Sequence, residues 1–206
     1  MKKGIDVSRW QGNIDFNKVK SSGIDFVIVK AGGSDDGFYT DKMFLRNVYN
    51  ALESGLHIGA YYFVGKYCKS ADAGLADAKR FYQIIKDCPL DYPVYIDFEA
   101  PDATNKQGNT AACIAFCSYM ESVGYYAGIY ASDVSGFKER LIPDQLVRFD
   151  KWVAKYSTYE PKVISKWGIW QYSSKGNVPG ISGHVDMNYS KNDYAEIIKQ
   201  HHLNGF

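Results

Sequence analysis

The sequence of 206 residues predicts an α/β fold, a compact (β/α) barrel of the TIM type in which the late helices are missing. Three observations support this prediction. Strand-like and helix-like segments alternate along the first two thirds of the chain, and this rhythm breaks after residue 150. No linker or low-complexity tract interrupts the chain, so we expect one domain that spans residues 1–206.

Each element of the first two thirds follows from its residue pattern. Apolar, β-branched and aromatic runs predict strands at 4–10, 25–32, 57–64, 92–100 and 125–132. Apolar residues at helical spacing predict helical segments between them at 15–21, 41–54, 70–87 and about 110–122. The run "DFVIVKAG" is continuously apolar, as expected of a strand buried on both faces. The alternation predicts βα units, and therefore a parallel sheet with right-handed crossovers.

The last third of the chain shows a different pattern. Three further strands are expected at 151–157, 167–174 and 184–190, followed by a helix at 192–200. The gaps between these strands are about ten residues long and show no helical stripe, whereas a parallel crossover normally needs a dozen residues or more and usually a helix. We therefore expect an irregular closure of the barrel, which antiparallel pairing would allow.

Composition excludes several classes of partner. The formal net charge is only +1, so no charged field is available to attract nucleic acid or an anionic membrane surface. No apolar run approaches the length of a bilayer span, and we expect no membrane insertion. The start, Met1-Lys2-Lys3, leads directly into a strand-like segment without the hydrophobic region of a signal peptide. We expect a monomer.

The four cysteines favour free and mostly buried thiols. There is no CxxC pair and no histidine at ligand spacing, so neither a zinc site nor another metal or cofactor is expected. Cys113 and Cys117 lie one helical turn apart, which is a poor arrangement for a disulfide. Cys68 and Cys88 could pair, but nothing in the sequence requires it.

The segment "YPVYIDFEAPD" ends a buried strand on two acids, Asp97 and Glu99. Side chains alternate along a strand, so these two carboxylates share one face while Phe98 points to the other. The C-terminal ends of the strands form the active-site face of a (β/α) barrel. Two like charges at that mouth raise the pKa of one of the two carboxyl groups, and that group can then donate a proton near neutral pH.

Two further acids fall at comparable places. Asp6 lies in the first strand and Asp186 in the last, and these strands become neighbours if the barrel closes. Four acids in one cavity destabilise the fold unless their charge serves a function or is offset by protons, hydrogen bonds or a metal. We therefore expect Asp6, Asp97, Glu99 and Asp186 to form a catalytic mouth.

The aromatic content, with 17 Tyr, 11 Phe and 4 Trp, fits either a tyrosine-rich core or a groove for flat ligands such as sugar rings. Carboxylates beside aromatic rings are typical of glycoside hydrolysis, which needs an acid for the leaving oxygen and a second carboxylate. Alternation lets only one of Tyr61 and Tyr62 point inward, and Tyr62 is the one we expect. The side chains expected to contact substrate are Lys30, Tyr62, Tyr130 and Trp170, with Trp10 as a further candidate.

The chain resembles glycoside hydrolase family 25, the Chalaropsis-type lysozymes that include many phage endolysins. The resemblance covers nearly the whole chain and is carried, in order, by "GIDVSRWQGNIDF", "GAYYF", "YIDFEA", "GIYAS", "WQYSS" and "HVDMNYS". It implies an irregular, flattened (β/α) TIM-like barrel with late helices missing. It also implies hydrolysis of the β-1,4 bond between N-acetylmuramic acid and N-acetylglucosamine in bacterial peptidoglycan, outside the cell or in the cell wall.

The resemblance also implies roles for individual residues. Glu99 matches the general acid of the family, and Asp97 would assist it or orient the 2-acetamido group of the substrate. Asp6 and Asp186 would complete the acidic mouth. Retaining, inverting and substrate-assisted courses all remain compatible with these residues.

Lys30 and Tyr130 match positions expected near the substrate. The chain departs from many relatives after Lys30, where Ala31-Gly32-Gly33 replaces a Thr-Glu pair, so contacts from this loop cannot be carried over.

Two other functions are compatible with parts of the pattern. The same barrel could bind cell-wall glycan without cutting it. A metal-dependent polysaccharide deacetylase would need an aspartate with paired histidine ligands. The adjacent pair His201-His202 lies near the C-terminus, where a solvated surface is the simpler interpretation. The four acids favour hydrolysis over both alternatives.

Overall fold

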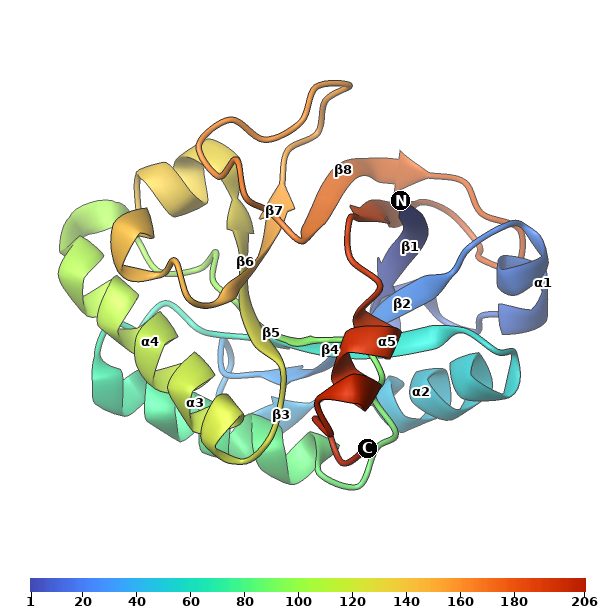
Figure 1. The fold of residues 1–206 in the computed structure, drawn as a ribbon, viewed down its shortest axis with the longest axis horizontal. Coiled ribbons are helices and arrows are strands. Elements are labelled where there is room, and N and C mark those ends of the chain that lie inside the picture. The colour runs from blue at the N-terminus through green and yellow to red at the C-terminus, as the bar shows by residue number, and fades with distance from the viewer.

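Eight strands close into a barrel in the computed structural model, which describes residues 1–206 (Figure 1). They are β1 (Lys2–Val7), β2 (Phe26–Gly33), β4 (His57–Phe63), β5 (Val94–Asp97), β6 (Ala127–Ser132), β7 (Asp150–Ala154), β8 (Ile169–Gly176) and β9 (Val185–Ser190). A two-residue strand, β3 (Tyr39–Thr40), pairs only with the end of β2. The sequence did not predict β3. The glycines at the end of β2 make room for it, because a Cβ at Gly32 would collide with the carbonyl oxygen of Tyr39.

The barrel closes through its last strand. Six neighbouring pairs are parallel, from β1–β2 around to β7–β8. Strand β9 is antiparallel to both β8 and β1. Because β9 runs in the opposite direction, its first residues lie beside the last residues of β1, and Asp186 is the register partner of Asp6. The irregular closure predicted from the sequence is therefore confirmed.

Four helices pack outside the first half of the barrel, as the alternating pattern predicts: α1 (Phe16–Ser21), α2 (Phe44–Glu53), α3 (Ala71–Ile85) and α4 (Lys106–Ser122). Ser70 and Asn105 cap α3 and α4 by accepting the backbone N–H groups of Ala73 and Gly108. Helix α4 begins four residues earlier than predicted, because its first turn carries no apolar residue to extend the stripe. Helices α3 and α4 lie side by side in Figure 1.

No long helix follows β6. The connections from there on are a π-helical turn, η3 (Asp133–Lys138), a 3-10 turn, η4 (Pro143–Gln145), and irregular loops. The chain ends with α5 (Tyr194–Gln200), which crosses the barrel in Figure 1. The prediction of a barrel with its late helices missing is confirmed.

Two apolar cores flank the strands. The larger one, of 47 residues, includes residues on the outer faces of the strands, such as Val27, Ile96 and Phe98, and side chains of the helices. The smaller one, of 11 residues, includes inward side chains such as Phe26, Tyr95 and Trp152. Both faces are buried along most of β2, β5 and β6, and the sequences of these strands are accordingly largely apolar.

The C-terminal residues seal the end of the barrel opposite the strand C-termini. The Asn204 side chain donates to the carbonyl oxygens of Leu90 and Tyr92, just before β5, at 2.9 and 3.0 Å. Its own oxygen accepts the backbone N–H of Tyr126 just before β6 at 2.9 Å. One end of the barrel is therefore plugged, which leaves the other end for a site.

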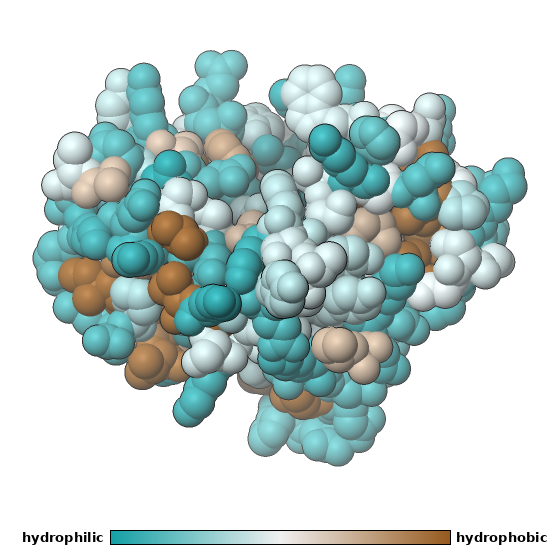
Figure 2. Space-filling model, turned by 90° about the horizontal axis from the view of Figure 1, so that it is seen from above, coloured by the Kyte–Doolittle hydropathy of each residue, from teal (hydrophilic) through white to brown (hydrophobic).

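The four cysteines are buried and unbonded, as predicted. Hydrophilic residues cover most of the face seen in Figure 2, and apolar residues on that face form small separate patches. None of the helices combines the length and the apolar character required to cross a bilayer.

Candidate active site

The structure brings the predicted acids to the open end of the barrel. Asp6 and Asp186 are paired across β1 and β9, and Asp97 is the last residue of β5. Glu99 follows two residues later and is exposed, whereas Asp6 and Asp97 are each only 5% exposed. Phe98, between Asp97 and Glu99, is buried in the outer core, so the predicted alternation along this strand is confirmed.

Asp6 is held in one orientation by a chain of hydrogen bonds. The indole N–H of Trp152 can only donate, and it donates to the side-chain oxygen of Asn188 at 2.8 Å. The amide nitrogen of Asn188 must therefore face Asp6, and it donates to Asp6 Oδ2 at 2.8 Å. Gln171 donates to the same oxygen at 2.9 Å. Since Oδ2 accepts two hydrogen bonds, a proton on Asp6 belongs on Oδ1.

Asp6 and Asp186 share a hydrogen bond and compete for one proton. Burial, followed by the charge of Asp186, raises the pKa of Asp6 well above its ordinary value. Burial also raises the pKa of Asp186, although the hydrogen bond from Asp6 opposes that shift. Both effects favour a protonated Asp6 that donates from Oδ1 to an ionised Asp186.

Asp97 and Glu99 form the second part of the mouth. Burial, followed by the charge of Glu99, raises the pKa of Asp97 well above its ordinary value. Its Oδ1 is buried and has no hydrogen-bond partner in the protein. Burial also raises the pKa of Glu99, while the positive charges of Lys30 and Arg140 oppose that rise. A carboxyl group that is both accessible and shifted toward its protonated form is suited to donate a proton.

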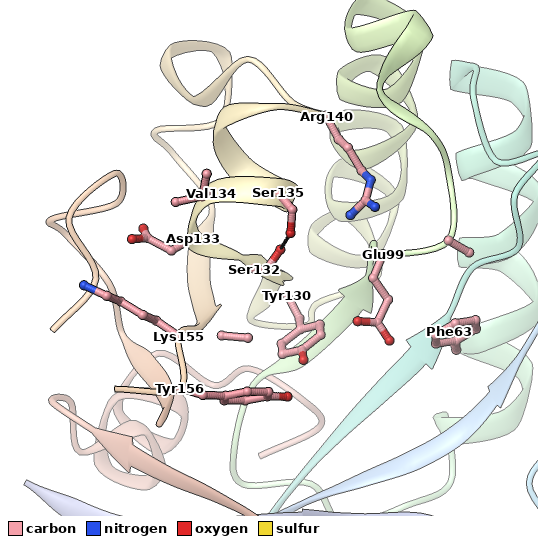
Figure 3. A pocket seen from close by; sticks show the side chains of 12 residues that line it. Phe63, Glu99, Tyr130, Ser132, Asp133, Val134, Ser135, Arg140, Lys155 and Tyr156 are labelled. Carbon is pink, nitrogen blue, oxygen red and sulfur yellow. Dashed lines mark hydrogen bonds between the residues drawn. The ribbon is translucent and has the colours of Figure 1, made fainter. Parts of the chain in front are cut away.

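Glu99 opens onto a cleft of about 670 Å³ (Figure 3). The cleft is large enough for sugar rings. The loops after β5, β6 and β7 form its walls, and the residues that line it are Phe63, Glu99, Ala100, Tyr130, Ser132, Asp133, Val134, Ser135, Arg140, Ala154, Lys155 and Tyr156.

Two of the four predicted substrate contacts lie at this mouth. The Tyr130 hydroxyl donates to Gln171 Oε1 at 2.9 Å, and the side chain lines the cleft. Lys30 Nζ lies 4.4 Å from the centre of the Phe63 ring, and its charge acts on both Asp97 and Glu99.

The other two predicted contacts point away from the mouth. Tyr62 is fully buried among Phe81 and Phe116 of the outer core, and its hydroxyl donates to the carbonyl oxygen of Gly33 at 3.0 Å. Its neighbour Tyr61 is the inward residue, and the charges of Asp6, Asp97 and Asp186 act on it. The choice of Tyr62 over Tyr61 therefore placed the wrong ring at the mouth.

Trp170 also belongs to the outer core. It packs against Trp167 and Tyr189, and its indole N–H donates to the carbonyl oxygen of Lys155 at 2.9 Å. The inward residue of that strand is Gln171, which the sequence reasoning missed. The further candidate Trp10 is 77% exposed, with the Arg9 guanidinium 5.0 Å from its ring centre.

Several site residues were absent from the sequence-based prediction: Asn188, Tyr156, Arg140 and Gln171. For two of them a signal exists, because Gln171 directly follows the apolar pair Ile169-Trp170 and Asn188 shares a strand face with Asp186. Tyr156 donates to Gln171 Oε1 at 3.1 Å. For Tyr156 and Arg140, which lie on loops, no pattern in the sequence marks the side chain as part of a site.

Comparison with known proteins identifies the class of this site. The family model of the glycosyl hydrolases family 25 matches residues 5–181. The chain belongs to this family. It is therefore a glycoside hydrolase, and the family and enzyme class predicted from the sequence motifs are confirmed.

The curated relatives of this family 25 chain include two lysozymes. It is 29% identical to the autolytic lysozyme of Clostridium acetobutylicum over 90% of this chain and 54% of that protein. It is also 29% identical to lysozyme M1 of Streptomyces globisporus over 95% of this chain and 70% of that protein. The chain thus spans about half of the length of the first relative.

Solved structures of family members share the fold. The CTP1L endolysin superimposes with a TM-score of 0.83 at 28% identity, over 97% of this chain and 70% of that chain. The bacterial lysozyme from Streptomyces coelicolor superimposes with a TM-score of 0.73 at 26% identity, over 96% of this chain and 95% of that chain. The expected TIM-like barrel is confirmed by these likenesses.

Proposed function

We propose that this chain is a muramidase, which hydrolyses the β-1,4 bond between N-acetylmuramic acid and N-acetylglucosamine in bacterial peptidoglycan, with Glu99 as the general acid. The observation that carries the proposal is the meeting of four carboxyl groups at one barrel mouth, with one of them, Glu99, open to a cleft. The two lysozyme relatives and the endolysin structure supply the substrate class.

The proposed reaction follows from the arrangement of the acids. Glu99 donates its proton to the glycosidic oxygen as the bond from that oxygen to the anomeric carbon breaks. The ionised carboxylates at the mouth stabilise the positive charge that develops on the sugar. A water oxygen then bonds to the anomeric carbon, and the proton it loses returns to a carboxylate. We propose that Asp97, at the end of β5 beside Glu99, assists the general acid or orients the 2-acetamido group of the sugar.

The substrate-facing side chains proposed here are Lys30, Tyr130 and Tyr61, which replaces Tyr62. Both alternatives raised by the sequence are weaker. A glycan-binding module transfers no proton, so binding alone does not require an exposed carboxyl group with a raised pKa. In a deacetylase the histidine pair would stand beside the acids, but His201 and His202 follow α5 near the plugged end of the barrel.

The setting of the reaction is also a proposal. Lysozyme and endolysin relatives indicate that the chain acts on the cell wall, and we propose that it works outside the cell or in the wall, after secretion or phage-driven release. We propose a monomer, since one chain supplies all four carboxyl groups of the mouth.

The test is the substitution Glu99→Gln. It should reduce lysis of cell-wall suspensions by about a hundredfold to ten-thousandfold, the contribution typical of a general acid, without changing the melting temperature. The matched control is Glu53→Gln on the exposed side of α2, which should leave activity unchanged. Mass spectrometry of the products should find N-acetylmuramic acid at the new reducing ends. Near-normal activity of Glu99→Gln would overturn the proposal. Products that have lost acetyl groups but whose glycan strands are uncut would overturn it as well.

A further inference from the structure

Arg140 is a cation in the catalytic cleft with no acidic side chain bound to it. None of the ion pairs within 4.0 Å includes it. In Figure 3 its guanidinium group points into the cleft on the side of Glu99. A guanidinium carries five N–H donors in a planar fork that matches the geometry of a carboxylate.

The other charged groups on this wall are turned away from the cleft. Lys155 Nζ donates to the carbonyl oxygen of Glu160 at 2.6 Å, and Figure 3 shows its amine directed outward. The Asp133 carboxylate accepts the backbone N–H groups of residues 162–164 at 3.0 to 3.2 Å. Asp133 therefore does not neutralise Arg140, and Arg140 is the one cationic group that this wall presents to a ligand.

The backbone at Arg140 is fixed on both sides. Its N–H donates to the carbonyl oxygen of Gly136 at 2.9 Å, at the end of η3. Its carbonyl oxygen accepts the side-chain amide of the buried Asn109 at 3.1 Å. The same wall carries Ser132 and Ser135, whose hydroxyl oxygens lie 2.6 Å apart. One hydroxyl donates to the other, so the accepting hydroxyl keeps its own proton for a ligand.

A guanidinium that lines the same cleft as a free hydroxyl proton is suited to bind a carboxylate, which an arginine can hold through two parallel hydrogen bonds. Peptidoglycan brings carboxylates to this position. The lactyl group on C3 of N-acetylmuramic acid carries a peptide stem with free carboxylates, and the sugar cleaved at its anomeric carbon must lie beside Glu99. The stem therefore begins within the same cleft.

We propose that Arg140, with the hydroxyls of Ser132 and Ser135, forms a subsite for a carboxylate of the peptide stem, and that this subsite makes the enzyme prefer glycan strands that still carry their stems. The proposal rests on the proposed muramidase function, because it places the muramic acid next to Glu99. It adds a specificity that the four acids alone do not provide.

The experiment compares two substrates. One is stem-bearing peptidoglycan without cross-links, and the other is the same glycan after an amidase has removed the stems and left the lactyl carboxylate on the sugar. Arg140→Gln should lower kcat/KM on stem-bearing strands by about tenfold to a hundredfold, the loss of one charge-assisted hydrogen bond. Arg140→Gln also removes a positive charge that acts on Glu99, and this effect is common to both substrates. The contribution of the subsite is therefore the amount by which the loss on stem-bearing strands exceeds the loss on stripped strands. The matched control is Lys138→Gln, because Lys138 is exposed on the same loop but does not line the cleft.

The outcomes separate this proposal from its alternatives. An equal loss on both substrates would overturn it, since Arg140 would then act through Glu99. A larger loss on stripped strands would overturn it as well, because the lactyl carboxylate would be the partner. Wild-type protein that cleaves neither substrate would contradict the muramidase function.

Binding gives a readout that does not depend on turnover. With Glu99→Gln as the background, a disaccharide that carries its stem should bind more tightly than one without, and Arg140→Gln should remove that difference. If the two disaccharides bind equally to the Glu99→Gln protein, the subsite does not exist.

Discussion

Asp6 offers a direct test of how the mouth tolerates its buried charges. Its Oδ2 accepts hydrogen bonds from Gln171 and Asn188, and its Oδ1 is free to carry a proton toward Asp186. An asparagine has the shape of this protonated form, with an oxygen for both donors and an N–H for Asp186. We therefore expect Asp6→Asn to fold with at least the stability of the wild type near neutral pH.

Asp6→Ala should behave very differently. It leaves the side-chain amides of Gln171 and Asn188 without an acceptor, and these residues are only 2% and 0% exposed. Each unsatisfied buried donor costs about 1–3 kcal/mol. The alanine variant should therefore lose about 2–6 kcal/mol in the free energy of unfolding, whereas the asparagine variant should lose almost none.

The free energy of unfolding should also depend on pH in a direction that the pKa of Asp6 determines. The pKa of Asp6 is raised in the folded state above its ordinary value of 3.8. The stability that its protonated form contributes is therefore fully present below about pH 4 and is lost as the pH rises through the folded-state pKa. Each unit of elevation corresponds to about 1.4 kcal/mol. Asp6→Asn removes this dependence, so its advantage over the wild type should grow as the pH rises.

Urea unfolding at about pH 5, 7 and 9 measures all three proteins under the same conditions. The reasoning would be refuted by an asparagine variant as unstable as the alanine variant. It would also be refuted by wild type and Asp6→Asn with parallel stability curves over this range.

Two further predictions concern other parts of the barrel. Tyr62→Phe should lose only the hydrogen bond to Gly33, which contributes about 0.5–1.5 kcal/mol of stability, and it should keep full activity. Tyr61→Phe should instead keep its stability and lose activity. Thermal melts and lysis assays on both variants decide which ring contacts the substrate. Asn204→Ala should cost about 2–4 kcal/mol, because it breaks three hydrogen bonds at the plugged end, two of them buried. Its activity per folded molecule should equal that of the wild type, and a specific loss of activity would show that the plug influences the mouth.

Several features of the fold and site could be predicted from local pattern. The order of strands and helices follows from apolar runs and helical stripes. The shared face of Asp97 and Glu99 follows from the period of two along a strand, and the absence of late helices follows from short gaps without a stripe. These are properties of neighbouring residues, so the sequence alone determines them.

The orientation of the aromatic residues could not be predicted in this way. Both faces of a barrel strand are buried here, one by helices and one by the barrel interior, so alternation shows that two residues differ in direction but not which one points inward. Tyr62 and Trp170 illustrate the difficulty, since each is as apolar and aromatic as a residue that faces the mouth. Packing against Phe81 and Phe116 decides the direction of Tyr62.

The convergence of the site is likewise a tertiary property. Asp6 meets Asp186 because β9 runs antiparallel to β1, and Arg140 reaches the cleft because η3 replaces a long helix after β6. Such contacts join residues far apart in the chain, and their geometry depends on how the whole barrel closes. The sequence by itself determined which acids exist and on which strands they lie, and only closure of the barrel decided which of them share a proton and which side chains surround them.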